Sequence, residues 1–179
     1  PYTTLFRSLD RLQELADSLT ADYGVAATAI AADLSTVEGP DQLYEEVHRR
    51  GLAVGVLINN AGLGAYGREL DIPWEKERTM IDVDVRAVVQ MTKLFTRDMV
   101  ARGTGYVLQV ASIAAYQPSP TYAAYGAAKA FVLSYGRALN YELRNTGVSC
   151  TVLSPGVTRT EFLDVADQDP TGFQRMTMM

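Results

Sequence analysis

Cysteines, basic clusters and long apolar runs are all scarce in this sequence, and each scarcity excludes a class of protein. The single cysteine, Cys150, cannot form an internal disulfide, so nothing points to an oxidising compartment. The 16 basic residues are outnumbered by 21 acidic residues and form no cluster, which argues against a general nucleic-acid binder. No run approaches the roughly 18 to 20 apolar residues of a membrane-spanning helix. We therefore expect a cytoplasmic, globular protein that binds neither nucleic acid nor membrane.

Helical and strand patterns alternate along the rest of the chain. Apolar residues at three- and four-residue spacing predict helices at residues 9–19, 39–51, 73–101 and 122–144. Short, almost wholly apolar runs predict buried strands within residues 24–33, 52–62, 105–112 and 147–156. Because each parallel crossover needs a covering helix, this alternation predicts an α/β fold, a doubly wound parallel sheet with helices on both faces.

Polar and small residues follow the predicted strands, where ligands bind in open parallel sheets. They are Asp33, the NNAG segment from Asn59 to Gly62, Ser112, and Ser154 to Gly156. Polar strand-to-helix loops are also common without any function, so each of these ends taken alone is ambiguous. Their joint occurrence predicts one ligand site at a single edge of the sheet.

A tyrosine and a lysine one helical turn apart form a candidate proton-transfer pair. Tyr125 and Lys129 lie four residues apart in YGAAK, so their side chains share one helix face. A phenol is a poor acid or base near neutrality, but an adjacent ammonium stabilises the phenolate and lowers the phenol's pKa. Ser112, thirteen positions before Tyr125, adds a hydroxyl that can bind a substrate oxygen.

These motifs together resemble the short-chain dehydrogenase/reductase family, of the type built on one Rossmann-like dinucleotide-binding domain. The matching segments are ADLS with Asp33, NNAG, Ser112, YGAAK, and PGVTRT from Pro155 to Thr160. The resemblance implies that Tyr125 is the general acid or base, that Ser112 holds the substrate oxygen, and that Lys129 lowers the Tyr125 pKa and binds the nicotinamide ribose.

The same resemblance implies a cofactor site for NAD or NADP and no metal. Its residues are Asp33 and Leu34 beside the adenine, Asn60, Ala61 and Gly62 near the adenosine ribose, Tyr125 and Lys129, and Pro155, Gly156, Thr158 and Thr160 near the nicotinamide. For Thr160, a plain helix N-cap is the alternative. The strand end that separates NAD from NADP binding in this family does not occur in the sequence.

Asp84 departs from the family pattern, which has Asn at this position beside the active site. An ionised Asp cannot donate a hydrogen bond, and it would attract the Lys129 ammonium and weaken its effect on Tyr125. In the family, this residue supports a water link to the catalytic lysine. If the backbone carbonyl makes that link, the substitution is silent. Both interpretations remain open at this point, and Asp84 is included among the candidate catalytic residues.

The two ends of the chain do not fit the family pattern. Residues 1–8, PYTTLFRS, resemble the translation of a sequencing adapter and are expected to be a non-native leader. No Gly-rich phosphate-binding turn precedes Asp33, so residues 9–179 are expected to be a truncated dinucleotide-binding domain without the first βαβ unit and the last strand. The chain as printed is then expected to be inactive and to bind neither dinucleotide.

The predicted activity of the parent protein is the NAD(P)-dependent interconversion of a carbonyl and an alcohol in a small-molecule substrate. Tyr66, Tyr116, Pro118 and Tyr122 suggest that this substrate is partly apolar. A non-catalytic relative that binds a nucleotide or a partner is the alternative. Apolar residues on more than one face of the helices at 73–101 and 122–144 predict a homodimer or homotetramer.

Overall fold

The computed structural model describes residues 9–156, which form two compact units. The first unit runs to Ala53 and the second begins at Val54. The predictions for residues 1–8, Thr158 and Thr160 lie outside the described residues. All four predicted helices and three of the four predicted strands are present.

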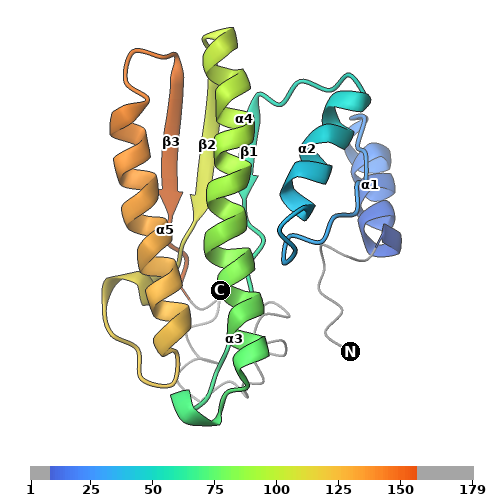
Figure 1. Ribbon diagram of the computed structural model, residues 1–179. Coiled ribbons are helices and arrows are strands. Elements are labelled where there is room, and N and C mark those ends of the chain that lie inside the picture. Colours follow the sequence, from blue (N-terminus) through green and yellow to red (C-terminus); the bar gives the residue numbers. More distant parts are fainter. Residues whose placement is uncertain (1–8, 157–179) are drawn as a thin grey trace. The chain divides into compact units, whose positions relative to one another are not determined.

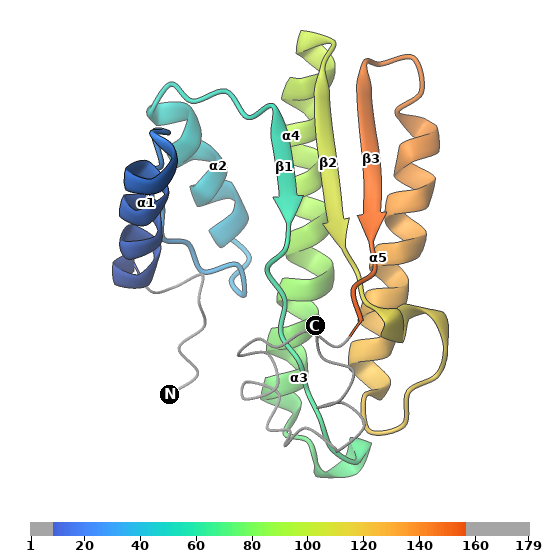
Figure 2. The ribbon, with the colours of Figure 1, turned by 180° about the vertical axis from the view of Figure 1, so that it is seen from behind.

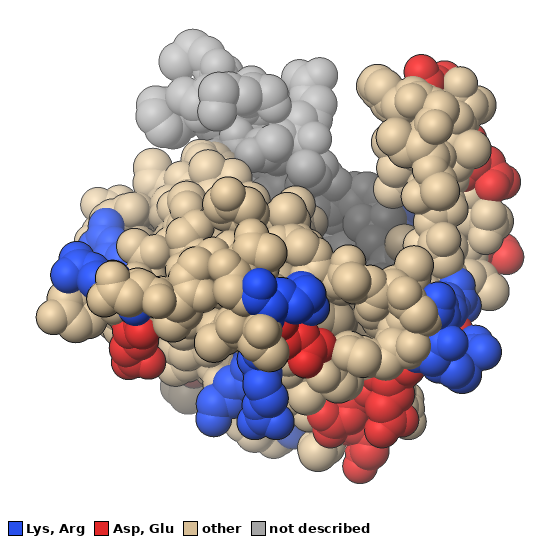
Figure 3. All heavy atoms as spheres, turned by 90° about the horizontal axis from the view of Figure 1, so that it is seen from above, with Lys and Arg blue, Asp and Glu red and all other residues tan. Residues whose placement is uncertain are grey.

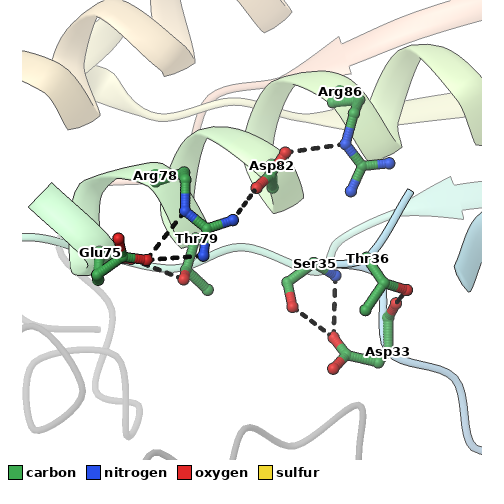
Figure 4. Close-up of polar contacts among 8 residues, drawn as sticks. All are labelled: Asp33, Ser35, Thr36, Glu75, Arg78, Thr79, Asp82 and Arg86. Carbon is green, nitrogen blue, oxygen red and sulfur yellow. Dashed lines mark hydrogen bonds and ion pairs between the residues drawn. The ribbon is translucent and has the colours of Figure 1, made fainter. Parts of the chain in front are cut away.

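The first unit contains helices α1, Leu9–Tyr23, and α2, Gly39–Arg49. A turn made by Asp33 leads into α2, as the close-up in Figure 4 shows: one carboxylate oxygen accepts hydrogen bonds from the Ser35 amide at 3.0 Å and the Ser35 hydroxyl at 2.6 Å. Gly39 then begins the helix at a place where a Cβ atom would lie 1.8 Å from the Asp33 carbonyl oxygen. Only glycine fits this close approach of two backbone segments.

The predicted strand at residues 24–33 is wrong. This segment has no regular secondary structure and pairs with no strand in the part of the chain that is described. Val25 is 49% exposed. A β-strand is held by hydrogen bonds to a neighbouring strand, so an apolar composition without such a neighbour does not form one.

The described part of the second unit is built on three parallel strands in the order β1-β2-β3. They are β1, Val56–Asn59, β2, Gly105–Val110, and β3, Val148–Leu153. Helices α4, Val88–Arg102, and α5, Ala123–Glu142, both lie against the same face of this sheet (Figure 1). Figure 2 shows the other face of the three strands, in front of the two helices. A parallel α/β arrangement is confirmed.

Alternation along the strands decides which side chains enter the core. On β2, Val107 is 2% exposed whereas its neighbour Tyr106 is 62% exposed. Successive side chains of a strand point to opposite faces, so one face of β2 packs against the helices. The cluster between the sheet and α4 and α5 contains Val88, Ala111, Val132 and Leu133.

A π-helical segment, Asp82–Ala87, joins α3, Trp74–Ile81, to α4. The three pieces occupy the place of the single predicted helix at 73–101. A π-helical turn widens the helix and occurs frequently at functional sites. Within this segment, Val83, Asp84 and Ala87 are buried.

A buried polar network fixes the carboxyl end of β1. The Asn59 amide donates hydrogen bonds to the Thr92 hydroxyl at 2.9 Å and to the Gln109 side-chain oxygen at 3.1 Å. Gln109, which is fully buried, donates to the same hydroxyl at 2.9 Å. Because each buried polar group has a partner, the network holds β1, β2 and α4 in one arrangement at this edge of the sheet.

Charged side chains of both signs are interspersed over the face shown in Figure 3. Within residues 9–156, no helix combines the length and the apolar character that crossing a membrane requires.

Candidate active site

The site lies where β1, β2 and β3 end. Backbone hydrogen bonds continue past the last two strands: the Ala111 amide donates to the Leu153 carbonyl at 2.8 Å, and the Ile113 amide donates to the Pro155 carbonyl at 2.9 Å. Ser112 is therefore held between two backbone contacts to the segment that follows β3. Predicted site residues after β2 and β3 share one edge of the sheet.

Ser112 begins a short 3₁₀ helix, Ile113–Tyr116. Its hydroxyl oxygen accepts a hydrogen bond from the Ala114 amide at 3.2 Å, which fixes the rotamer. The same hydroxyl forms a hydrogen bond with the Tyr125 phenol. The predicted juxtaposition of Ser112 and Tyr125 is present.

Tyr125 and Lys129 lie on the buried face of α5, with 9% and 5% of each residue exposed. The Lys129 ammonium nitrogen lies 5.8 Å from the centre of the Tyr125 ring. This spacing follows from the helix, which brings residues four apart onto one face. The pair predicted from YGAAK is therefore close together in space.

Asp84 meets Lys129 from the π-helical segment. The Asp84 carboxylate is fully buried, and one of its oxygens lies 3.0 Å from the Lys129 ammonium. That oxygen has no well-aligned hydrogen bond, so the contact is an ion pair. The other oxygen accepts a hydrogen bond from the Leu63 amide at 2.7 Å. Lys129 also donates to the Val110 carbonyl at 3.2 Å.

Burial, a hydrogen bond and a nearby charge act on the pKa of Tyr125. Burial raises the pKa of Tyr125 to about 12, the hydrogen bond from Ser112 opposes this rise, and the charge of Asp84 adds to it. The lowering of this pKa by Lys129, which the resemblance implies, stays a prediction. The Asp84 carboxylate lies 3.0 Å from the Lys129 ammonium, so the field of the anion opposes that of the cation at the phenol.

Burial also raises the pKa of Asp84, against the opposing effects of the Lys129 charge and the Leu63 amide. The carboxylate therefore relies on these two neighbours to remain ionised.

Aromatic side chains continue from Tyr125 towards the loop after β1. The Tyr122 ring is tilted against both neighbours, with its centre 5.6 Å from that of Tyr125 and 5.2 Å from that of Tyr66. The Gly67 amide donates to the Thr121 carbonyl at 3.0 Å and fixes the two loops together. These rings give the surroundings of Tyr125 a partly apolar character.

The predicted cofactor residues are distributed between the two units. Asn60, Ala61 and Gly62 follow β1, and Pro155 and Gly156 follow β3. Asp33 and Leu34 belong to the first unit.

Three groups that contact the charged pair are not evident from residue types. The Leu63 amide and the Val110 carbonyl are backbone groups, which no residue pattern identifies. Gly62 was predicted to lie near the ribose, yet a Cβ atom there would lie 3.1 Å from the Lys129 ammonium and 3.2 Å from the Asp84 carboxylate. The glycine in NNAG is the one signal of this contact in the sequence.

The comparisons with known proteins agree with this geometry. Residues 2–171 match the short chain dehydrogenase family. The chain belongs to that family, and its α/β, Rossmann-like fold is confirmed. A solved structure of a short-chain dehydrogenase from Sphingobium yanoikuyae in complex with NADPH superposes with a TM-score of 0.85 at 31% identity, covering 91% of this chain and 64% of that one.

Two curated relatives indicate the range of activities in similar proteins. The 17-beta-hydroxysteroid dehydrogenase type 3 of Mus musculus is 32% identical over 151 residues, which cover 83% of this chain and 49% of the relative. The very-long-chain 3-oxoacyl-CoA reductase of Anas platyrhynchos is 30% identical over 167 residues, 89% of this chain and 52% of the relative. The chain spans about half the length of these relatives.

Proposed function

We propose that this chain carries the proton-transfer residues of an NAD(P)-dependent oxidoreductase that interconverts a carbonyl and an alcohol. The observation that carries the proposal is the Ser112–Tyr125 hydrogen bond beside Lys129, at the carboxyl ends of β2 and β3, in a chain of this family. The proposed compartment is the cytoplasm, in keeping with the buried, unpaired thiol of Cys150.

The proposed roles follow from the positions of the side chains. Ser112 holds the substrate oxygen by its hydroxyl, and Tyr125 donates a proton to that oxygen during reduction or accepts it during oxidation. The rings of Tyr66 and Tyr122 contact the apolar part of the substrate. A bound dinucleotide supplies or accepts the hydride.

The described residues after β1 and β3 fit a dinucleotide. Asn60 to Gly62 is a loop of small and polar residues at the carboxyl end of β1, where such cofactors bind. Gly62 carries no side chain, so the backbone of this loop can lie close to Lys129 and Asp84. Asp33, Leu34, Pro155, Gly156, Thr158 and Thr160 are the further cofactor residues that we propose.

The direct test uses the full-length product of the reading frame that contains this sequence, hereafter the full-length product. It is incubated with NADH or NADPH and a panel of carbonyl compounds that includes ketosteroids and 3-oxoacyl thioesters, and the loss of reduced-nicotinamide absorbance is followed. Turnover with at least one carbonyl is expected. The printed chain alone is the control and is expected to be inactive, because it contains no Gly-rich phosphate-binding turn. Dinucleotide binding without turnover on any substrate would instead favour a non-catalytic binding protein.

Assembly is a second prediction. We propose that the full-length product is a homodimer or homotetramer through the helices at residues 73–101 and 122–144. Phe131 is 40% exposed on α5 and stacks on Tyr135, with ring centres 5.7 Å apart, which leaves an apolar surface for a second copy. Sedimentation at micromolar concentration is expected to give an oligomer, and Phe131→Glu is expected to shift it towards monomer. A monomeric wild-type protein would contradict the prediction.

A further inference from the structure

Asp84 stands out because it is a fully buried carboxylate within the proton-transfer group. Its two oxygens are held separately, one by the Leu63 amide at 2.7 Å and one by the Lys129 ammonium at 3.0 Å. Taking a carboxylate out of water is costly unless it is paired. The geometry therefore requires Lys129 as its partner, and it fixes the ammonium against the loop after β1.

The positive charge of Lys129 is therefore already paired with Asp84 before any ligand binds. Lys129 is only 5% exposed. Its ammonium donates a hydrogen bond to the Val110 carbonyl at 3.2 Å and forms an ion pair with Asp84. A cation and an anion 3.0 Å apart act on a third group as a dipole, whose effect is much weaker than that of a lone cation.

The groups that face the Tyr125 phenol come from four places in the described part of the fold. Ser112 follows β2, Tyr122 precedes α5, Lys129 lies one turn further along α5, and Asp84 lies on the π-helical segment. Tyr66, the next aromatic residue, packs on Tyr122. Lys129 is the cation closest to the phenol among the contacts that the structure shows, and Asp84 is the group that neutralises it.

We propose that Asp84 is a positioning residue that neutralises Lys129 and so keeps Tyr125 protonated at neutral pH, which favours its use as the proton donor in carbonyl reduction. This inference rests on the proposed function. In reduction, the carbonyl carbon receives a hydride from the cofactor, and the carbonyl oxygen receives the Tyr125 proton, which leaves an alcohol and a phenolate. Water then returns a proton to the phenolate. Oxidation needs the phenolate first, so its rate is expected to rise only at high pH.

The raised pKa of Tyr125 is consistent with this assignment, since burial and the charge of Asp84 both raise it. In the family pattern, the uncharged Asn at this position leaves the lysine charge unopposed. The Asp84 carboxylate thus changes the protonation of a residue that it does not contact.

The first experiment measures the ionisation of Tyr125 without any turnover. The full-length product is labelled with ¹³C at the tyrosine Cζ atoms and titrated by NMR, with the Tyr125 signal assigned by its loss in Tyr125→Phe. In Asp84→Asn, the Tyr125 midpoint is expected to move down by about one pH unit or more, because Lys129 then acts as an unopposed cation.

Asp82→Asn is the matched control. Asp82 lies two residues earlier on the same π-helical segment, and its carboxylate pairs with Arg86 at 2.9 Å and Arg78 at 3.4 Å instead of Lys129 (Figure 4). The Asp82→Asn variant removes one negative charge from the same π-helical segment, and its Tyr125 titration midpoint is expected to stay at the wild-type value. An unchanged midpoint in Asp84→Asn, or an equal movement in Asp82→Asn, would overturn the proposal.

The double variant Asp84→Asn/Lys129→Met keeps the test decisive if the single variant does not fold. The Asn and Met side chains of the double variant have no net charge, as the wild-type Asp84–Lys129 pair has none. The Tyr125 titration midpoint is therefore expected to return to the wild-type value. A lowered Tyr125 midpoint would contradict the inference. A kinetic readout follows: in Asp84→Asn the pH–rate profile for alcohol oxidation is expected to move to lower pH by the same amount as the NMR midpoint. If the wild-type protein shows no turnover, the proposed function fails while the titration still decides the role of Asp84.

Discussion

Replacing Tyr125 with phenylalanine is expected to lower kcat of the full-length product by about 10²- to 10⁴-fold, the usual contribution of a positioned general acid or base. The substitution removes the phenol oxygen that hydrogen-bonds Ser112 and leaves the ring in contact with Tyr122. Packing is therefore retained, and the dissociation constant for the dinucleotide is expected to change little. Steady-state kinetics and calorimetric titration with NAD and NADP measure the two quantities.

Tyr135→Phe is the control for this experiment. Tyr135 lies further along α5, is half-buried, and hydrogen-bonds Thr92 through its phenol. The Tyr135→Phe variant also loses a phenol oxygen, but at a site away from Ser112. Its kcat is therefore expected to remain near that of the wild type. Turnover that survives in Tyr125→Phe, or that falls equally in both variants, would refute the proposed role of Tyr125.

Replacing Lys129 with methionine is expected to lower the free energy of unfolding by about 3–5 kcal/mol, the usual effect of removing one partner of a buried ion pair. Asp84 then keeps the Leu63 hydrogen bond and loses its counter-ion. Burial already raises the pKa of Asp84, and loss of the cation raises it further. In this variant Asp84 keeps a proton in the folded state that it releases in the unfolded state, so the free energy of unfolding falls as pH rises. The destabilisation by Lys129→Met is therefore expected to be larger near pH 8 than near pH 5.

Urea unfolding at both pH values measures this effect. Lys93→Met, at an exposed position on α4, is the control and is expected to cost little at either pH. The double variant Asp84→Asn/Lys129→Met is expected to recover most of the lost stability, because no buried charge is then left without a partner. If Lys129→Met is as stable as Lys93→Met, the ion pair does not contribute in the way described.

Local patterns predicted the elements of the second unit because the relevant interactions are local. The apolar periodicity around α4 and α5 and the short apolar runs of β1, β2 and β3 are each sufficient to identify one element. The segment at residues 24–33 has the same composition as these strands, yet it forms none, because a strand depends on neighbours that a local pattern does not contain.

The candidate site was predicted in its side chains and missed in its backbone. The YGAAK motif and Ser112 identified three side chains that lie together. The sequence left two interpretations of Asp84 open, and the 3.0 Å contact with Lys129 favours the one in which the two charges attract. The Leu63 amide and the Val110 carbonyl became visible only in the fold. The raised pKa of Tyr125 could not be predicted either, because it depends on burial, which composition does not determine.

The π-helical segment at Asp82–Ala87 has a consequence for helical phase. Met80, Asp84 and Val88 are all buried, and they follow one another at intervals of four residues. In a regular α-helix, each interval of four residues turns the side-chain direction by about 40° beyond one full turn. A wider turn holds more residues and removes that extra rotation. If one residue of the segment were deleted, the rest of α4 would rotate by about 100° relative to α3. The wide turn that brings Asp84 inward to Lys129 therefore also determines which side of α4 faces the sheet.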